Sequence, residues 1–259
     1  MKQKVERFYE VSSGGQHADA AQRNGQRRAV QELSRWSGLA LAAVFLAVVG
    51  ISGCNDSTSV AHLRVLHASP DAPNVDINLD GKNVLTNVAY KTASDYLDVP
   101  AGTHTIKVYP TGTTNAVITA SVPLTKNTYT TVAAINFVAK IEGKVITDDN
   151  TEPTSGNVKV RLIHFSPSAG SVDIYVTAPG ADLSNATPTL TNVPFDTVSD
   201  YVSVPAGSYE VRVTPTTTKE VVVDSGTLAL TAGQIRTGVA LDNPGTNPPF
   251  TAIVLKDLN

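Results

Sequence analysis

The chain has 259 residues, enough for one large domain or two small domains that each bury a core. Only 6% of the residues are aromatic, while 18 Gly and 15 Pro interrupt the chain, a composition typical of short strands joined by tight turns. Residues 1–53 hold seven of the 20 Lys/Arg and four of the 23 Asp/Glu, which leaves residues 54–259 with 13 basic and 19 acidic side chains and a net charge near −6. This charge and the absence of a basic stripe argue against a nucleic-acid partner and against electrostatic binding to anionic lipid.

An apolar run at residues 38–51 predicts an export signal. Its 14 residues are too few to cross a bilayer comfortably as a helix, but they suit the hydrophobic region of a signal peptide. The string Ile51-Ser52-Gly53-Cys54 resembles a bacterial lipobox, in which the cysteine is acylated and becomes the new N-terminus. We therefore predict a leader and lipoprotein signal peptide at residues 1–53, lipidation at Cys54 and a polar tether at 54–61. The alternative is a plain transmembrane anchor with a chance cysteine.

The polar segment before this signal is long for a signal peptide. Three interpretations compete: a wrongly assigned start with true initiation near Val30, a long cytoplasmic leader, and a twin-arginine signal at Arg27-Arg28. The sequence Ala-Val-Gln-Glu after the two arginines matches a twin-arginine signal poorly, and a start-site error is favoured. The segment is excluded from the fold argument.

The rest of the chain contains the same pattern twice. R-x-x-H-x-S-P occurs at residues 64–70 and 161–167, and V-D-I occurs at 75–77 and 172–174, both at an offset of 97. S-D-Y-x-x-V-P-A-G then occurs at 94–102 and 199–207, at an offset of 105. The second copy has therefore gained eight residues. We predict a first repeat at 62–149, a linker at 150–157 and a second repeat at 158–259.

The added residues fall in one loop. In the first copy Asp80-Gly81 separates two apolar segments, which predicts a hairpin with a type I′ turn. In the second copy residues 178–188 replace this turn. A loop that grows without disturbing its flanking strands lies on the surface and offers a route to a different contact.

Alternation predicts the fold class. Ile106 and Val108 share one face of a strand while Thr105 and Lys107 share the other, and each copy contains about seven such segments. Nothing after Cys54 shows a sustained helical period. The prediction is all-β: two tandem immunoglobulin-like or transthyretin-like antiparallel β-sandwiches.

The acidic string at residues 148–157 marks the boundary between the copies. Its Asp, Asn, Pro and Gly residues are typical of a linker. Asp148, Asp149 and Glu152 could supply oxygen ligands to a calcium ion that stiffens the molecule as an adhesin-like spacer. A solvated turn is favoured over this, because no established ligand spacing is present.

The doubled signature also suggests a hydrolase, because it brings His, Ser and Asp into one short region. Period-two geometry argues against that alternative, since His67 shares a face with Val65 and points inward while Asp76 points the other way. Metal binding by His67 with Asp71 or Asp76, or by His164 with Asp173, would leave an incomplete site. A structural role is favoured for the whole signature, and no catalytic residue, metal ligand or cofactor is predicted. The signature residues are Arg64, His67, Ser69, Pro70, Asp76, Tyr96, Pro100 and Gly102, with Arg161, His164, Ser166, Pro167, Asp173, Tyr201, Pro205 and Gly207 in the second copy.

The Ser-Asp-Tyr stretch predicts a corner of each sandwich. Pro100 suits the second position of a type I turn and Gly102 the fourth. Tyr96 and Tyr201 either cap the sheet through a hydrogen-bonded hydroxyl, which is favoured, or stand exposed as a binding platform.

On these motifs the chain resembles bacterial lipoproteins of the family catalogued as domain of unknown function 4397 (DUF4397), whose domains commonly occur in tandem on exported proteins. The resemblance covers nearly all of residues 62–259 and implies no established activity. Together with the signal, it leads us to expect a non-enzymatic, lipid-anchored protein of the bacterial cell envelope, at the outer membrane or cell surface. The membrane would be reached through the lipid at Cys54, and the partner would be an envelope glycan or protein.

Overall fold

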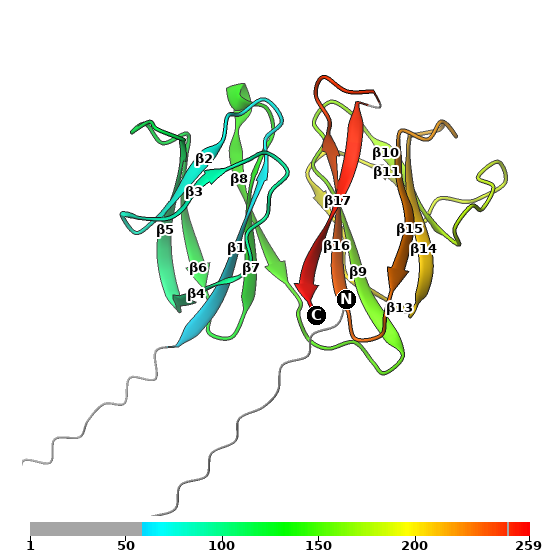
Figure 1. Ribbon diagram of the computed structural model, residues 1–259, viewed down its shortest axis with the longest axis horizontal. Coiled ribbons are helices and arrows are strands. Elements are labelled where there is room, and N and C mark those ends of the chain that lie inside the picture. Colours follow the sequence, from blue (N-terminus) through cyan, green and yellow to red (C-terminus); the bar gives the residue numbers. More distant parts are fainter. Residues whose placement is uncertain (1–58, 248) are drawn as a thin grey trace, which may run out of the picture. The chain divides into compact units, whose positions relative to one another are not determined.

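More than half of the described chain is β-strand, and most of the rest is turns and loops. The structure, a computed structural model, describes residues 59–247 and 249–259, so the signal segment and Cys54 lie outside the described residues (Figure 1). The described part of the chain contains no helix long and apolar enough to cross a membrane. The all-β sandwich class predicted from the sequence is confirmed.

The first copy of the signature lies in a pair of four-stranded sheets, which we call the first sandwich. Sheet A has the strand order β4-β1-β7-β8 and sheet B the order β3-β2-β5-β6. The strands are β1 (Val60–Ala68), β2 (Val75–Leu79), β3 (Lys82–Val88), β4 (Leu97–Pro100), β5 (Gly102–Pro110), β6 (Ile118–Leu124), β7 (Tyr129–Ile135) and β8 (Glu142–Asp148), with a 3₁₀ helix, η1 (Val138–Lys140), before β8.

The second copy repeats this arrangement in the second sandwich. Sheet C has the order β12-β9-β16-β17, with β13 also paired to β9, and sheet D the order β11-β10-β14-β15. The strands are β9 (Asn157–His164), β10 (Val172–Thr177), β11 (Leu190–Val193), β12 (Thr197–Val198), β13 (Val202–Pro205), β14 (Gly207–Pro215), β15 (Val223–Leu230), β16 (Ile235–Asp242) and β17 (Phe250–Leu258).

The strand pairing corrects one detail of the prediction. β1 pairs with β7 in parallel, and β9 pairs with β16 in parallel, so sheets A and C are mixed while sheets B and D are antiparallel. Local alternation cannot distinguish the two pairings, because a strand shows the same period of two in either direction.

Two local predictions are confirmed. Asp80 and Gly81 both have positive φ, at 50° and 89°, in the two-residue connection between β2 and β3, as a type I′ hairpin requires. Ile106 and Val108 are 1% and 3% exposed on the core face of β5.

Sheet A is buried on both faces. Leu63 and Val65 belong to a core cluster inside the first sandwich. Leu66 and Ala68 belong instead to a separate cluster that contains residues of both sandwiches. Its ten buried side chains are Leu66, Ala68, Ala133, Ile135 and Ile146 from the first sandwich and Ile163, Phe165, Val239, Leu241 and Leu255 from the second. We call this set the inter-repeat core.

The loop insertion lies between β10 and β11 and covers part of sheet D. Most of residues 178–188 are exposed, but Leu183 is 6% exposed. Three charged side chains of the second sandwich hold the loop backbone: Glu210 Oε2 accepts from the Gly180 N–H at 2.5 Å, Arg212 Nη2 donates to the Ala181 carbonyl at 2.6 Å, and Lys219 Nζ donates to the Ala186 carbonyl at 2.5 Å.

Candidate functional site

The arginine of the signature makes an ion pair across the boundary between the sandwiches. Arg64, on β1, is 2% exposed, and its Nη2 donates to Asp257 Oδ1 on β17 at 2.6 Å. Its Nε donates to Thr131 Oγ1 at 2.9 Å and its Nη1 to the Lys256 carbonyl at 3.2 Å. Arg64 Nη2 also lies 3.5 Å from Asp148 Oδ2 in its own sandwich.

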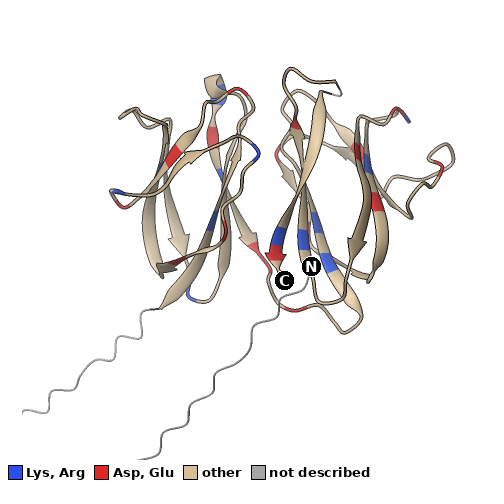
Figure 2. Cartoon of the chain, viewed as in Figure 1, with Lys and Arg blue, Asp and Glu red and all other residues tan. Residues whose placement is uncertain are grey.

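The second arginine makes the reciprocal pair. Arg161, on β9, is 3% exposed, and its Nη2 donates to Asp148 Oδ1 on β8 at 2.5 Å. Its Nε donates to Thr237 Oγ1 at 3.2 Å and its Nη1 to the Thr147 carbonyl at 3.1 Å. Each arginine thus binds the carboxylate at the end of the last strand of the other sandwich. In Figure 2 the acidic ends of β8 and β17 lie at the same end of the sheets as basic positions on β9 and β16.

The signature tyrosines complete this network. Tyr96 donates its hydroxyl hydrogen to Asp148 Oδ2 at 2.7 Å, and Tyr201 donates to Asp257 Oδ2 at 2.9 Å. The guanidinium carbons of Arg64 and Arg161 lie 4.6 Å and 4.4 Å from the ring centroids of Tyr96 and Tyr201. The tyrosines therefore bind the buried ion pairs, and their rings are covered by arginine. We call Arg64, Tyr96, Asp148, Arg161, Tyr201, Asp257 and the two threonines, Thr131 and Thr237, the inter-repeat network.

Burial and charge act in opposite directions on this network. Burial alone disfavours the charged form of Arg64, but Asp257, Tyr96 and Asp148 outweigh it and raise the pKa of Arg64. Burial raises the pKa of both Tyr96 and Tyr201. The negative charge of Asp148 raises the pKa of Tyr96 further, and that of Asp257 does the same for Tyr201. Arg64 therefore stays charged, and the two phenols stay neutral hydrogen-bond donors.

The position of Asp148 corrects the sequence interpretation of the linker. The acidic string was expected to be a solvated turn, yet Asp148 is 4% exposed and binds both arginines. Its neighbour Asp149 pairs with Lys159 Nζ at 2.6 Å, and hydrogen bonds from Lys159 and Thr151 lower the pKa of Asp149 to about 2. Protein cations thus already neutralise both carboxylates, and no group of metal-binding side chains is found among the described residues.

Both ring nitrogens of each signature histidine form hydrogen bonds with backbone groups. His67 Nε2 donates to the Pro73 carbonyl at 3.0 Å, and its Nδ1 accepts from the Ser69 N–H at 3.4 Å. His164 makes the same pair of contacts with the Gly170 carbonyl at 2.8 Å and the Ser166 N–H at 3.4 Å. Burial lowers the pKa of both rings. Within the described ranges neither ring hydrogen-bonds a side-chain hydroxyl or carboxylate, which is the contact that the hydrolase alternative requires.

The signature serines differ between the copies. Ser166 Oγ donates to Asp242 Oδ1, whereas Ser69 Oγ is buried and has no hydrogen-bond partner among the described residues. Pro70 and Pro167 follow these serines at the point where β1 and β9 have ended.

The aspartates of V-D-I fix a bend in the neighbouring strand. Asp76 Oδ1 accepts from the backbone N–H of Asn87 and from Thr111 Oγ1, at 2.8 and 2.9 Å. Asp173 Oδ1 accepts in the same way from the Asn192 N–H at 2.8 Å. Asn87 and Asn192 have φ of 56° and 49°, and the ladder register shifts beside both. These carboxylates thus stabilise a residue in the left-handed region and do not approach the histidines.

The Pro-Ala-Gly stretches connect the two sheets of each sandwich. β4 ends at Pro100 in sheet A and β5 begins at Gly102 in sheet B, so Ala101 alone makes the connection. Pro205 and Gly207 flank the equivalent connection between β13 and β14. The stretch therefore turns a corner between sheets, as the corner interpretation expected.

The sequence reasoning missed the carboxylates at the centre of the network. The signal for them is a further doubled pattern, V-I-T-D at residues 145–148 and V-L-K-D at 254–257, at an offset of 109. It is short and lies at the end of each copy, where the acidic string suggested a linker.

A polar groove lies between the sandwiches. It has a volume of about 520 Å³ and takes lining residues from both copies. From the first come Lys144, Thr147 and Asp149, and from the second Ser199, Asp200 and Tyr201. Lys144 Nζ bridges the sandwiches through an ion pair with Asp196 Oδ2 at 2.7 Å. Asp200 is exposed and makes no ion pair among the described residues.

Comparison with known proteins gives one match along the sequence. A family model described as "Domain of unknown function (DUF4397)" matches residues 61–175 and 177–259. No curated protein matches the chain.

Similar solved structures include an alpha-glucan-binding virulence factor and a carbohydrate-binding module. One, from "Alpha-glucan binding by a streptococcal virulence factor", is 14% identical with a TM-score of 0.24, and the match covers 69% of this chain and 92% of that one. A carbohydrate-binding module of family 26 from Eubacterium rectale, in complex with maltoheptaose, is 11% identical with a TM-score of 0.22, covering 76% and 98%. TM-scores this low carry no argument about what this chain binds.

Proposed function

From the premise that the chain belongs to the DUF4397 family, we propose that it is a non-enzymatic binding module of the bacterial cell envelope, anchored by lipid at Cys54. Its two sandwiches act as one unit, and the polar groove between them is the ligand site. The ligand class that suits this groove is an envelope glycan.

The inter-repeat network is the observation that supports this proposal. It uses the signature arginines and tyrosines to join the two copies, so these residues are occupied in the interior and are not available for catalysis. A groove whose walls come from two copies is pre-formed only if the copies are held together. Preorganisation of this kind lowers the entropic cost of binding.

The groove offers side chains that suit a polyhydroxylated ligand. Carboxylates of Asp149 and Asp200 accept hydrogen bonds from sugar hydroxyls, and the exposed hydroxyl of Thr147 donates and accepts them. Lys144, Asp149 and Arg161 are already paired, which leaves Asp200 as the groove charge without an ion pair among the described residues. This low net charge favours a neutral glycan over a polyanion.

Residues Asn55–Asn259 form a single compact unit, and the glycan proposal is tested with this unit on an array of bacterial envelope glycans. We expect binding that Asp200→Ala weakens about tenfold, as expected for the loss of a charge-assisted hydrogen bond. Asp95→Ala is the matched control, because Asp95 occupies the same position of the first Ser-Asp-Tyr stretch and does not line the groove. Equal loss in both variants, or no glycan bound by the wild type, would contradict the proposal.

The anchoring proposal is tested separately by metabolic labelling with palmitate in a bacterial host. The wild-type chain should incorporate the label and a Cys54→Ala variant should not. Label that persists in the variant would show that Cys54 is not the site of acylation.

A further inference from the structure

The two sandwiches have equivalent strand arrangements but differ in the volume of the space between their sheets. The space between sheets A and B is about 10 Å³, whereas the space between sheets C and D is about 80 Å³. At roughly 10–15 Å³ for one water-sized group, the larger cavity accommodates a string of about six such groups. We call it the second-sandwich cavity.

The side chains that face these spaces differ between the copies. In the parallel ladder of sheet A, Val65 pairs with Val132, and at the equivalent position of sheet C Leu162 pairs with Gly238. Gly238 has no side chain where the first copy has Val132, and the Leu162 side chain lies 3.1 Å from the position that a Cβ of residue 238 would take. The two valines are each 3% exposed, whereas Leu162 is only half-buried.

The cavity wall formed by β15 is also more exposed than the equivalent wall of the first sandwich. Val122 and Leu124, on β6, are 0% and 3% exposed in the first sandwich. Their equivalents by ladder register, Leu228 and Leu230 on β15, are only half-buried. Val254, on the other edge strand β17, also lines the cavity and is 46% exposed, close to the 44% of its equivalent Val145 in the first sandwich. The cavity therefore opens between β15 and β17.

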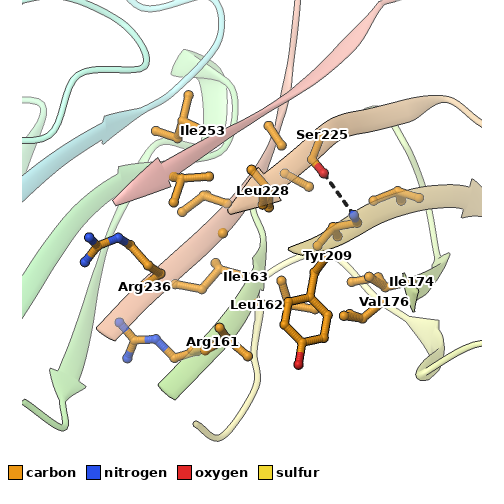
Figure 3. Close-up of a pocket in the computed structure, with 18 of the residues that line it drawn as sticks. Arg161, Leu162, Ile163, Ile174, Val176, Tyr209, Ser225, Leu228, Arg236 and Ile253 are labelled. Atoms are coloured by element: carbon orange, nitrogen blue, oxygen red, sulfur yellow. Dashed lines mark hydrogen bonds between the residues drawn. The ribbon is translucent and has the colours of Figure 1, made fainter. Parts of the chain in front are cut away.

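The cavity wall is apolar and its hydroxyl groups are already bonded. Ser225 Oγ donates to the Gly226 carbonyl at 2.8 Å and accepts from the Val211 N–H at 2.9 Å, and the Tyr209 hydroxyl donates to the Pro205 carbonyl at 2.7 Å (Figure 3). A ligand inside the cavity thus gains from apolar burial and finds no unpaired hydroxyl.

Arg236, which lines the cavity, and its exposed cross-strand partner Lys256 replace two threonines of the first sandwich. In the first sandwich Thr130 pairs across the strands with Thr147, and the equivalent pair in the second is Arg236 with Lys256. Like charges placed directly opposite each other are unfavourable in a sheet. Arg236 Nη1 donates to the carbonyls of Ile235 and Leu258, at 2.9 Å each, and neither cation has an ion pair among the described residues.

The position of Arg236 relates these charges to the cavity. In Figure 3 Leu162 and Leu228, from opposite sheets, lie on two sides of the space, and the Arg236 side chain extends from its edge with the guanidinium directed outward. An alkyl chain within the cavity would place an anionic head group at this guanidinium.

We propose that the second-sandwich cavity binds a single-chain anionic amphiphile, a medium-chain fatty acid, with its alkyl chain between sheets C and D and its carboxylate at Arg236 and Lys256. The charge complementarity and the apolar wall together select this class, and the first sandwich binds no such ligand because Val132 and the Thr130–Thr147 pair take the corresponding places. The site is separate from the polar groove.

The test is calorimetric titration of the unit Asn55–Asn259 with heptanoate, whose six alkyl carbons match the cavity, and with heptanol as the uncharged analogue. We expect one heptanoate per chain. Gly238→Val, which restores the side chain of the first copy and displaces Leu162 into the cavity, should weaken heptanoate binding at least tenfold. Gly143→Val is the matched control, because a Cβ at Gly143 meets Ile118 at 3.1 Å in the first sandwich, just as a Cβ at Gly238 meets Leu162 at 3.1 Å in the second.

The head group is tested by the double variant Arg236→Thr/Lys256→Thr, which also serves if Gly238→Val fails to fold. It should weaken heptanoate binding about tenfold and leave heptanol binding unchanged. No heptanoate bound by the wild type, a folded Gly238→Val variant with wild-type affinity, or equal loss for heptanoate and heptanol in the double variant would each overturn the proposal.

Discussion

At the scale of single residues, the buried carboxylates Asp148 and Asp257 determine how the two copies are joined. Each accepts hydrogen bonds from an arginine of the other sandwich and from a tyrosine and a threonine of its own. A buried ion pair gains little net free energy, because desolvation offsets the attraction, but removing one partner leaves an uncompensated charge. The network therefore specifies the geometry of the boundary more than it adds stability.

Asp148→Ala should lower the free energy of unfolding by about 3–5 kcal/mol, because Arg161 would keep a buried charge without its carboxylate. Urea denaturation of the unit Asn55–Asn259 measures this. Asp149→Asn is the control on the adjacent residue, where the side chain is 51% exposed and its pair with Lys159 contributes less than about 1 kcal/mol. Equal effects of the two substitutions would contradict the buried network.

The buried histidines make stability depend on pH. Burial lowers the pKa of His67 and of His164 below the value of 6.5 in the unfolded chain, although at His164 the nearby Asp242 opposes the shift. Between the folded and unfolded pKa values the unfolded state binds more protons, so stability is fully present above about pH 6.5 and is lost as the pH falls through the folded pKa. The urea concentration at the unfolding midpoint should therefore decrease as the pH is lowered from 7.5 to 5.

His104 provides a control of opposite sign. Its hydrogen bonds with Asp80 and the Pro100 carbonyl outweigh burial and raise its pKa, so it contributes stability below about pH 6.5 that is lost at higher pH. In His104→Gln the loss on acidification should be larger than in the wild type. A midpoint that does not change between pH 7.5 and pH 5 in this variant would show that the buried histidines are not responsible.

At the scale of elements, the two copies differ in a loop and in the contacts that this loop makes with sheet D. The insertion at residues 178–188 contacts charged side chains of sheet D through its backbone and inserts Leu183 as its one buried side chain within the described loop. Its attachment is local. It contributes to the second sandwich without altering the frame that both copies share.

Leu183→Ala should release this loop, because the buried side chain contributes about 1.5–3 kcal/mol to its attachment. Limited proteolysis should cleave residues 178–188 at least five times faster than in the wild type, in keeping with a locally opened segment. Asn185→Ala, at an exposed position of the same loop, should leave the rate unchanged. Cleavage that begins elsewhere in the second sandwich would indicate global destabilisation instead.

At the scale of the whole molecule, the inter-repeat core and network make the two sandwiches parts of one unit. Residues Asn55–Asn259 form a single compact unit, and the ten side chains of the inter-repeat core are buried against both copies. Separation of the sandwiches would expose these apolar side chains and the two reciprocal ion pairs at once.

The described unit should therefore unfold in one cooperative transition, with a calorimetric enthalpy equal to the van't Hoff enthalpy. Leu241→Asp, which places an unpaired charge in the inter-repeat core, should split this into two transitions. Val222→Asp is the matched control outside that core. Val222 packs at the rim of the second sandwich, so this substitution should lower the midpoint temperature of a single transition. Two transitions in the wild type would show that the copies unfold independently.

Much of the fold could be predicted from local signals. The type I′ turn at Asp80-Gly81, the alternation of Ile106 and Val108 and the doubled signature all depend on residues close in sequence, so they indicate strands and their order without tertiary information. The parallel pairing of β1 with β7 is a contact between distant strands, which local periodicity does not encode.

The candidate site was harder to predict for the same reason. Arg64 stood out because it is doubled, but its carboxylate partner Asp257 is 193 residues away. Asp148 was placed in a linker by its neighbours, because composition does not reveal that a polar residue is paired in the interior.

The sequence by itself determined that this chain contains two copies of one β module and where the copies differ, because turn chemistry and alternation are local properties of the backbone. Only the tertiary structure decided that the signature arginines join the copies and that a cavity lies between the sheets of one of them. Burial, ion pairing and packing volume arise from residues far apart in the chain, and they exist only once the sheets are brought together.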